Sequence, residues 1–96
     1  MKTHVTISTS GRIVSDDKVL DFAKKLIGSD NIVIGTNVML NAFRVLRARG
    51  EIEELTIMFC NGETRTTDKN GMVENWPSDP VLDAEMILLT ELAGWN

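Results

Sequence analysis

Two hydrophobic patterns in the first half of the chain constrain its fold most: one is typical of a β-strand and the other of an amphipathic helix. Residues Thr3 to Thr9 alternate polar and apolar side chains and place Val5 and Ile7 on one face, the period of a half-buried or edge strand. From Val19 to Ile27 apolar side chains recur at i, i+3, i+4, i+7 and i+8, as in an amphipathic helix, and Ser15 precedes them as a suitable N-cap. The first 27 residues therefore predict a strand followed by a helix.

The same order is repeated directly afterwards. Gly28 ends the first helical pattern, and Asn31 to Thr36 contains the β-branched run Ile32-Val33-Ile34, which predicts a central strand covered on both faces. A second helical pattern runs from Asn37 to Arg49 and ends at Gly50. Strand-helix repeats favour parallel strands joined by right-handed crossovers.

The second half predicts an antiparallel meander. Leu55 to Cys60 is an apolar strand that buries its cysteine, and Asn61-Gly62 is a strong hairpin signal leading into Glu63 to Asp68. A turn at Lys69 to Gly71 then leads to a third strand, Met72 to Trp76.

A last helix is predicted from Asp79, its N-cap, to about Ala93, and its apolar residues spread over more than one face. The full order is β-α-β-α-β-β-β-α. We expect residues 1–96 to form a single α/β domain with a short parallel sheet, an antiparallel meander and a C-terminal helix.

Composition limits the class of protein. The chain has 96 residues, of which 43% are hydrophobic and 25% charged, enough for one core without disulfide or metal staples. Cys60 is the only cysteine, so we expect a reduced, cytoplasmic protein. We see no signal peptide and no membrane span.

Charge divides the chain into two unlike halves. Residues 1–50 hold eight Lys/Arg and four Asp/Glu, whereas residues 51–96 hold two and ten. The first half carries Arg44, Arg47 and Arg49 on one predicted helix, which is compatible with anion binding and with ordinary stabilisation of a helix C-terminus. The asymmetry also suits internal pairing of the halves, a basic partner or self-association.

The motifs of several enzyme classes are missing. The chain has no phosphate-binding loop ending in Gly-Lys-Ser/Thr, no Gly-x-Gly-x-x-Gly and no Gly-x-Ser-x-Gly. Nothing in the sequence joins His4 and Cys60 into a catalytic pair, and Asp16 and Asp17 suit a helix start better than a metal site. We therefore expect no enzymatic activity, no cofactor and no bound metal.

One position is a weak candidate for ligand binding. In open α/β sheets, ligands bind beyond the carboxyl ends of parallel strands. The polar residues expected at those ends are Thr9, Ser10, Gly11, Thr36 and Asn37.

From about Val5 to Pro77, several short motifs occur in a recognisable order. The chain resembles the C-terminal part of the ATPase domain in ABC-type predicted ATPases related to the overcoming-lysogenisation-defect proteins. The motifs that carry the resemblance are Ile34-Gly35-Thr36-Asn37-Val38, Leu40-Asn41-Ala42-Phe43-Arg44, Gly50-Glu51-Ile52, Gly71 and Trp76-Pro77.

The chain departs from this family at its catalytic positions. Ser8 and Thr9 stand where the family has Asp-Glu for magnesium and water activation, and Asn37 stands where it has the switch histidine. The family's nucleotide-binding half has no counterpart here. The resemblance therefore implies a catalytically silent fragment.

These patterns together predict a non-catalytic interaction module. We expect it to act as a small regulator or inhibitor of phage or mobile-element type that imitates an ATPase surface. The expected partner is a protein, either an ATPase or a nucleic-acid-processing complex, and self-association as a homodimer is open. The alternative is a nucleic-acid-linked protein, either an acidic DNA mimic or a phosphate binder. The candidate partner-binding residues are Arg44, Arg47, Arg49, Glu85, Met86 and Trp95.

Overall fold

The computed structural model describes residues 2–77 of the chain. They form the elements β1 (Lys2–Arg12), α1 (Val19–Lys25, preceded by a 3-10 turn at Asp16–Lys18), β2 (Ile32–Ile34), α2 (Asn37–Ala48), β3 (Glu54–Met58) and β4 (Thr64–Thr66). The strands form one mixed sheet in the order β2-β1-β3-β4. β1 is parallel to β2 and to β3, and β4 is antiparallel to β3. This is the α/β class that the sequence predicts. The predicted helix over 79–93 lies outside the described residues.

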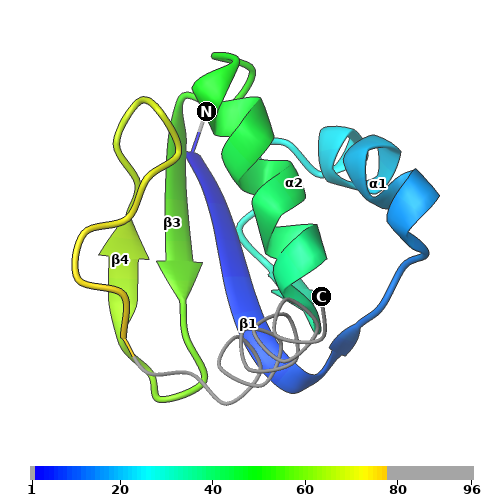
Figure 1. Ribbon diagram of the computed structural model, residues 1–96, viewed down its shortest axis with the longest axis horizontal. Helices are drawn as coiled ribbons and strands as arrows, with labels where there is room; N and C mark the ends of the chain where they lie inside the picture. The colour runs from blue at the N-terminus through cyan, green and yellow to red at the C-terminus, as the bar shows by residue number, and fades with distance from the viewer. Residues whose placement is uncertain (1, 78–96) are drawn as a thin grey trace, which may run out of the picture.

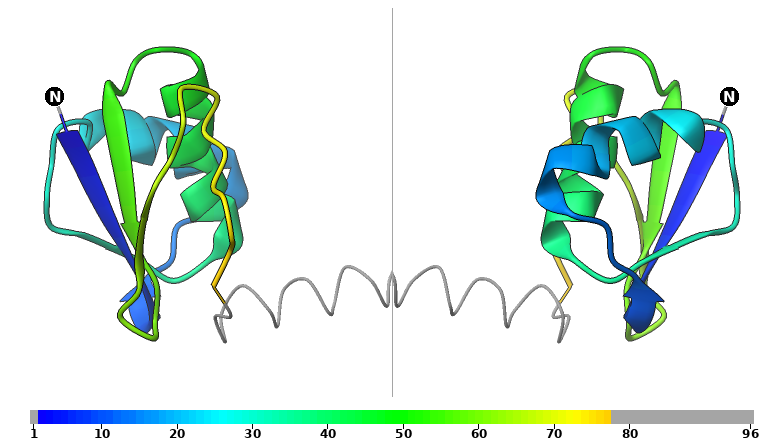
Figure 2. Two further views of the ribbon diagram at one scale, coloured as in Figure 1. Left: turned by 90° about the vertical axis from the view of Figure 1, so that its left-hand side faces the viewer. Right: turned by 90° about the vertical axis from the view of Figure 1, so that its right-hand side faces the viewer.

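The core lies between one face of the sheet and the two helices. The alternation in β1 is confirmed, because Val5 and Ile7 are buried while His4, Thr6 and Ser8 are only partly covered. Figures 1 and 2 show α1 and α2 on the same face of the sheet. The side chains that fill this layer include Leu40, Phe43 and Leu46 from α2, each fully buried.

The prediction of two right-handed crossovers is wrong for one connection. The links β1-α1-β2 and β2-α2-β3 run across the sheet in opposite directions, so two helices on one face give them opposite hands (Figure 1). The reason lies in the path of β1. Ile34 pairs with Ile7 and, past an irregularity, with Arg12, so the end of β1 crosses the end of β2 before α1 begins.

The prediction that Ile32-Val33-Ile34 forms a central strand is wrong. This strand, β2, lies at the edge of the sheet. Ile32 and Ile34 are buried, whereas Val33 is 42% exposed on the opposite face. A continuous β-branched strand is buried on both faces only where both faces of the sheet are covered by other elements. Among residues 2–77 the helices supply one layer.

The hairpin prediction is confirmed, with a different turn. The Gly62 N–H donates to the Phe59 carbonyl and the Phe59 N–H donates to the Glu63 carbonyl, with Gly62 at φ +87°. Cys60 and Asn61 are therefore the central turn residues, and Gly62 takes the left-handed position that follows. Cys60, expected to be buried in a strand, lies in this turn and is exposed; its Sγ is 3.3 Å from the Ile7 carbonyl oxygen.

The predicted third strand of the meander, Met72 to Trp76, does not form. The turn before it is present, with Gly71 at φ +74°, but residues 72–76 are not assigned to a strand. The Met72 carbonyl accepts from the Asp68 N–H, and the Asn75 carbonyl accepts from the Arg65 Nε. Asn75 has φ +52°, which breaks an extended strand.

Candidate functional site

At the edge of the sheet where a ligand was expected, the backbone at Gly11 and Arg12 packs against the backbone at Ile34 and Gly35. A Cβ on Gly11 would lie 2.2 Å from the Ile34 carbonyl oxygen, and the Gly35 N–H donates to the Arg12 carbonyl at 3.0 Å. The crossing segment therefore covers the end of β2. A crevice between strands needs neighbouring helices on opposite faces, and here both helices cover the same face.

The hydroxyl groups at this edge serve local structure. The Thr36 Oγ1 accepts from the Met39 N–H at 3.2 Å and caps α2, which begins at Asn37. The Ser8 and Ser10 hydroxyls lie 3.1 Å apart, and both Thr9 and Ser10 are exposed. Gly11 therefore lies close to the segment before α2, and the Thr36 hydroxyl already accepts a hydrogen bond as the N-cap of α2.

Arg44 joins α2 to the loop that follows β4. Its Nε donates to the Gly71 carbonyl at 2.7 Å and one terminal nitrogen donates to the Asn41 Oδ1 at 3.0 Å. Its guanidinium carbon lies 5.1 Å from the centre of the Trp76 ring. Partial burial lowers the pKa of Arg44 from its ordinary value, but the group stays charged because that value is so high.

The three arginines of α2 do not form one free cationic surface. Arg47 is half-buried and donates to the Ile52 carbonyl at 3.4 Å, and its Nε is buried with no hydrogen-bond partner. Arg49, the C-cap residue, is exposed. Phosphate contact through this helix would rest mainly on Arg49, since Arg44 and Arg47 donate to the protein itself.

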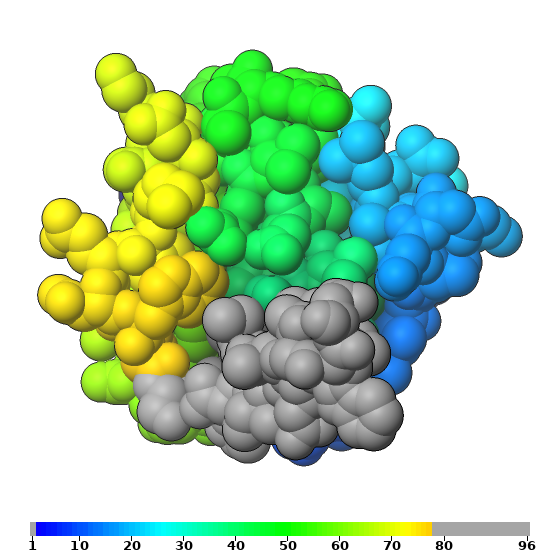
Figure 3. Space-filling model, in the orientation of Figure 1, coloured from blue at the N-terminus to red at the C-terminus, as the bar shows by residue number. Residues whose placement is uncertain are grey.

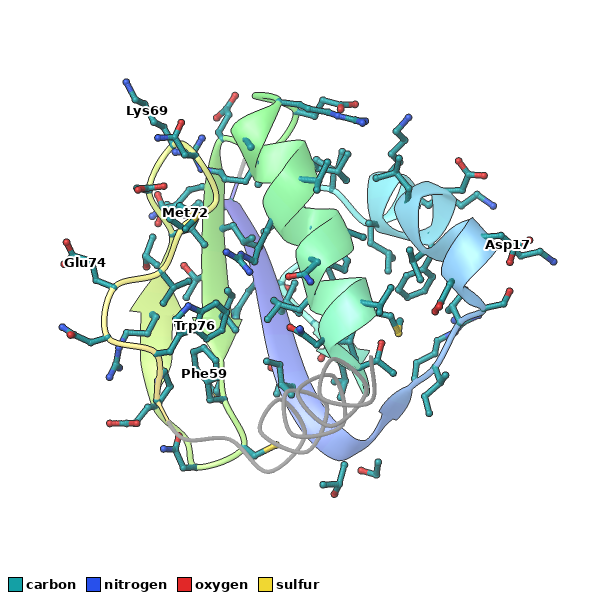
Figure 4. All side chains as sticks on the ribbon, in the orientation of Figure 1. Asp17, Phe59, Lys69, Met72, Glu74 and Trp76 are labelled. Atoms are coloured by element: carbon teal, nitrogen blue, oxygen red, sulfur yellow. The ribbon has the colours of Figure 1, made fainter. Side chains whose placement is uncertain are left out.

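The Trp76 ring lies between Arg44 and the buried Phe59. The Trp76 ring meets Phe59 edge to face, with ring centres 5.6 Å apart and planes at 82°. Figure 4 shows Phe59 and Trp76 side by side, with Met72 above them and Lys69 and Glu74 pointing away from the molecule.

Three exposed hydrophobic side chains lie around this arginine. Met72 is 56% exposed, and Trp76 and Val45 are 41% exposed. A hollow beside Arg44 is lined by Val45 and Gly71 among others, and an Arg44 terminal nitrogen lies 3.6 Å from the Met72 Sδ. We call Arg44, Val45, Met72 and Trp76 the Trp76 surface (Figure 3 shows the loop packed against α2).

Sequence reasoning identified only part of this surface. Arg44 is among the expected partner-binding residues, whereas Met72 and Trp76 are predicted only as the ends of a third meander strand. The sequence signal that points to this surface is the pair Gly71 and Trp76, five residues apart. In the structure both residues contact Arg44 of α2. The other expected residues, Glu85, Met86 and Trp95, lie outside the described residues.

Comparisons with protein-family models, with curated proteins and with solved structures found no significant match. The resemblance to ABC-type ATPases therefore stays a prediction. Within residues 2–77, no three His, Cys, Asp or Glu side chains gather closely enough to hold a metal ion. No helix in that same range is long and apolar enough to cross a membrane.

Proposed function

We propose that this chain is a protein-interaction module that binds its partner through the Trp76 surface. One observation carries the proposal: the Trp76 ring is held by Phe59 at one side and by the Arg44 guanidinium at another, and 41% of the residue still faces solvent. Trp and Arg are the residues most often responsible for binding energy at protein interfaces.

The contacts around Trp76 also favour binding energetically. An aromatic side chain that is already positioned loses less conformational freedom when a partner docks than a mobile one does. Gly71 fixes the loop on α2, because its carbonyl accepts from Arg44 and its Cα packs against the helix backbone at Arg44. The surface is thus formed before binding.

The residues that carry the family resemblance support a proposal for the class of partner. Arg44, Gly71 and Trp76 come from three separate motifs, and the structure brings them into contact. This supports a regulator or inhibitor of phage type that imitates one ATPase surface and binds the assembly in which that ATPase, or a nucleic-acid-processing complex, takes part. A single cysteine in the whole chain supports action in the cytoplasm.

Surface variants test this proposal. The tagged wild-type chain and its V45K and M72E variants are used to capture partners from cell lysate, with V33K as the matched control, since Val33 is exposed to the same extent as Val45 but lies in β2. A specific partner should be retained by V33K and lost by about tenfold or more with V45K and M72E. Equal recovery with all four proteins would refute binding through this surface.

A further inference from the structure

The hollow beside Arg44 lies between α2 and the loop that follows β4, which pack against each other in Figure 3. It has a volume of about 420 Å³. Asn41, Arg44 and Asn70 supply its polar side chains, and Val45 and Ala48 supply its apolar part. Among the described residues, no Asp or Glu lines it. We call it the Arg44 hollow.

The Arg44 guanidinium is partly buried, and the acceptors that it contacts are neutral. Its Nε and one terminal nitrogen donate to the Gly71 carbonyl and to the Asn41 Oδ1. The other terminal nitrogen lies 3.6 Å from the Met72 Sδ, and a thioether is a weak acceptor. Within residues 2–77 Arg44 forms no ion pair, and no carboxylate offsets the lowering of its pKa by burial. A charge that has lost part of its water gains from an opposite charge.

The carboxylate of the same loop, Asp68, does not neutralise this arginine. Its Oδ1 accepts from the Asn70 N–H at 2.8 Å and from the Met72 N–H at 3.0 Å. These hydrogen bonds account for most of the lowering of the Asp68 pKa. Asp68 therefore holds the turn, and the described part of the chain supplies no anion to the Arg44 hollow.

We propose that the Arg44 hollow receives the carboxylate of an Asp or Glu side chain of the partner, next to an apolar side chain that packs on Met72 and Trp76. This inference rests on the proposed function, because it assigns chemistry to the partner of the Trp76 surface. A carboxylate accepts parallel N–H bonds from a guanidinium, and the Asn41 and Asn70 amides can donate at the same place. A phosphate is a poorer match, since its second charge needs a second cation and no other Lys or Arg of residues 2–77 lines the hollow.

The contacts that Arg44 already makes favour this pairing. Because Gly71 and Asn41 hold the guanidinium in place, little side-chain freedom is lost when a carboxylate binds. An ion pair in a partly desolvated hollow contributes more than one at the open surface, where water and salt screen the charges. Apolar contact with Met72 and Trp76 supplies most of the binding, and the carboxylate selects among apolar partners.

Peptide selection on the full-length chain tests this proposal. Binders are selected from a display library of random peptides and retested on V45K and M72E. The peptides that these variants lose should carry Asp or Glu beside an apolar residue. Changing that acid to its amide should raise the Kd by about tenfold or more.

The outcomes separate this inference from the proposed function. Peptides that depend on V45K and M72E but carry no acid, or that bind equally well as amides, would overturn the carboxylate assignment and leave the Trp76 surface in place. A selection whose binders ignore both variants, or that yields no binder, would refute the surface and the inference together.

A carboxylate placed in the hollow gives a second readout. N70D should raise the Kd of an acidic peptide by about tenfold or more and leave that of its amide form nearly unchanged. A merely structural effect on the turn would weaken both peptides equally. N31D is the matched control, since Asn31 is also exposed but precedes β2, and it should change neither Kd. An acidic peptide that binds N70D as tightly as the wild type would overturn the proposal.

Discussion

The two helices cover the same face of the sheet but are held very differently. α2 has 12 residues, is capped by the Thr36 hydroxyl and buries five side chains. α1 has seven residues, starts from a 3-10 turn without a side-chain cap and buries two, Val19 and Ala23. Cap and burial together decide how firmly a short helix is anchored, because an isolated helix of either length is unstable in water.

This difference separates the two surfaces of the molecule. The Trp76 surface rests on α2, the well-anchored helix, whereas a second hollow, lined by Arg12, Phe22 and Leu26 among others, lies along α1, which buries fewer side chains. A rigid support suits recognition of a partner, since little order must be gained on binding. A helix with few buried side chains opens locally at a lower free energy than a well-packed one.

The largest expected effect compares one aromatic residue from each helix. F43A removes a fully buried side chain beneath α2 and should lower the free energy of unfolding by about 3–5 kcal/mol. F22A removes a half-buried ring from α1 and should cost less than half as much. Urea unfolding of both variants measures this difference, and equal losses would contradict the unequal anchoring of the helices.

Gly71 provides the next test, because it fixes the loop against α2. In G71A the new Cβ would meet the Arg44 carbonyl oxygen at 2.4 Å in addition to the strain of φ +74°. Gly50 is the control, since φ there is +82° and no atom lies within 4 Å of the added Cβ. Thermal unfolding should show a loss of about 1–2 kcal/mol for G50A, from the left-handed backbone alone, and a clearly larger loss for G71A. Similar losses would mean that the loop does not press on the helix.

Removing the N-cap side chains of the two helices should change the free energy of unfolding by smaller amounts. T36A removes the acceptor for the Met39 N–H and should destabilise the protein by about 0.5–2 kcal/mol. The Ser15 hydroxyl makes no capping hydrogen bond, so S15A should change stability by no more than about 0.5 kcal/mol. Chemical denaturation is the measurement, and a larger loss in S15A than in T36A would reverse the comparison.

The smallest effect concerns pH and the loop at Gly71. Hydrogen bonds from the Met72 and Asn70 N–H groups lower the pKa of Asp68, with small contributions from Arg47 and Lys69. A carboxyl group with a lowered folded pKa stabilises the fold above its unfolded pKa of about 3.9, and this contribution is lost as pH falls through the folded value. The Asn70 and Met72 amide shifts should therefore change below about pH 4, and D68A should abolish that change. Amide shifts that stay constant throughout the acid range, both above and below the folded pKa, would contradict the role of Asp68.

The sequence predicted the elements of the core well because their patterns are local. The alternation around Val5 and Ile7 and the helical spacing of Phe43 and Leu46 each record which side chains are buried. Val33 shows the limit of this reasoning, since an exposed edge residue and a doubly covered one have the same β-branched side chain.

The candidate site was predicted less completely because it depends on contacts between distant segments. The sequence gives no sign that the end of β1 crosses β2, which packs Gly11 against Ile34 where a ligand was expected. Nor does it show that Arg44 donates to Gly71, 27 residues away. Tertiary packing determines such contacts, and hydrophobic periodicity does not predict them because it reports only on neighbouring residues in the sequence.

Hydrogen exchange of the complex with its captured partner tests the central claim most directly. If the Trp76 surface is the binding site, the partner should slow amide exchange in the second half of α2 and over residues 68–76, and should leave β2 unchanged. Protection confined to β2, or to the sheet face opposite the helices, with unchanged exchange at residues 68–76, would show that recognition occurs elsewhere.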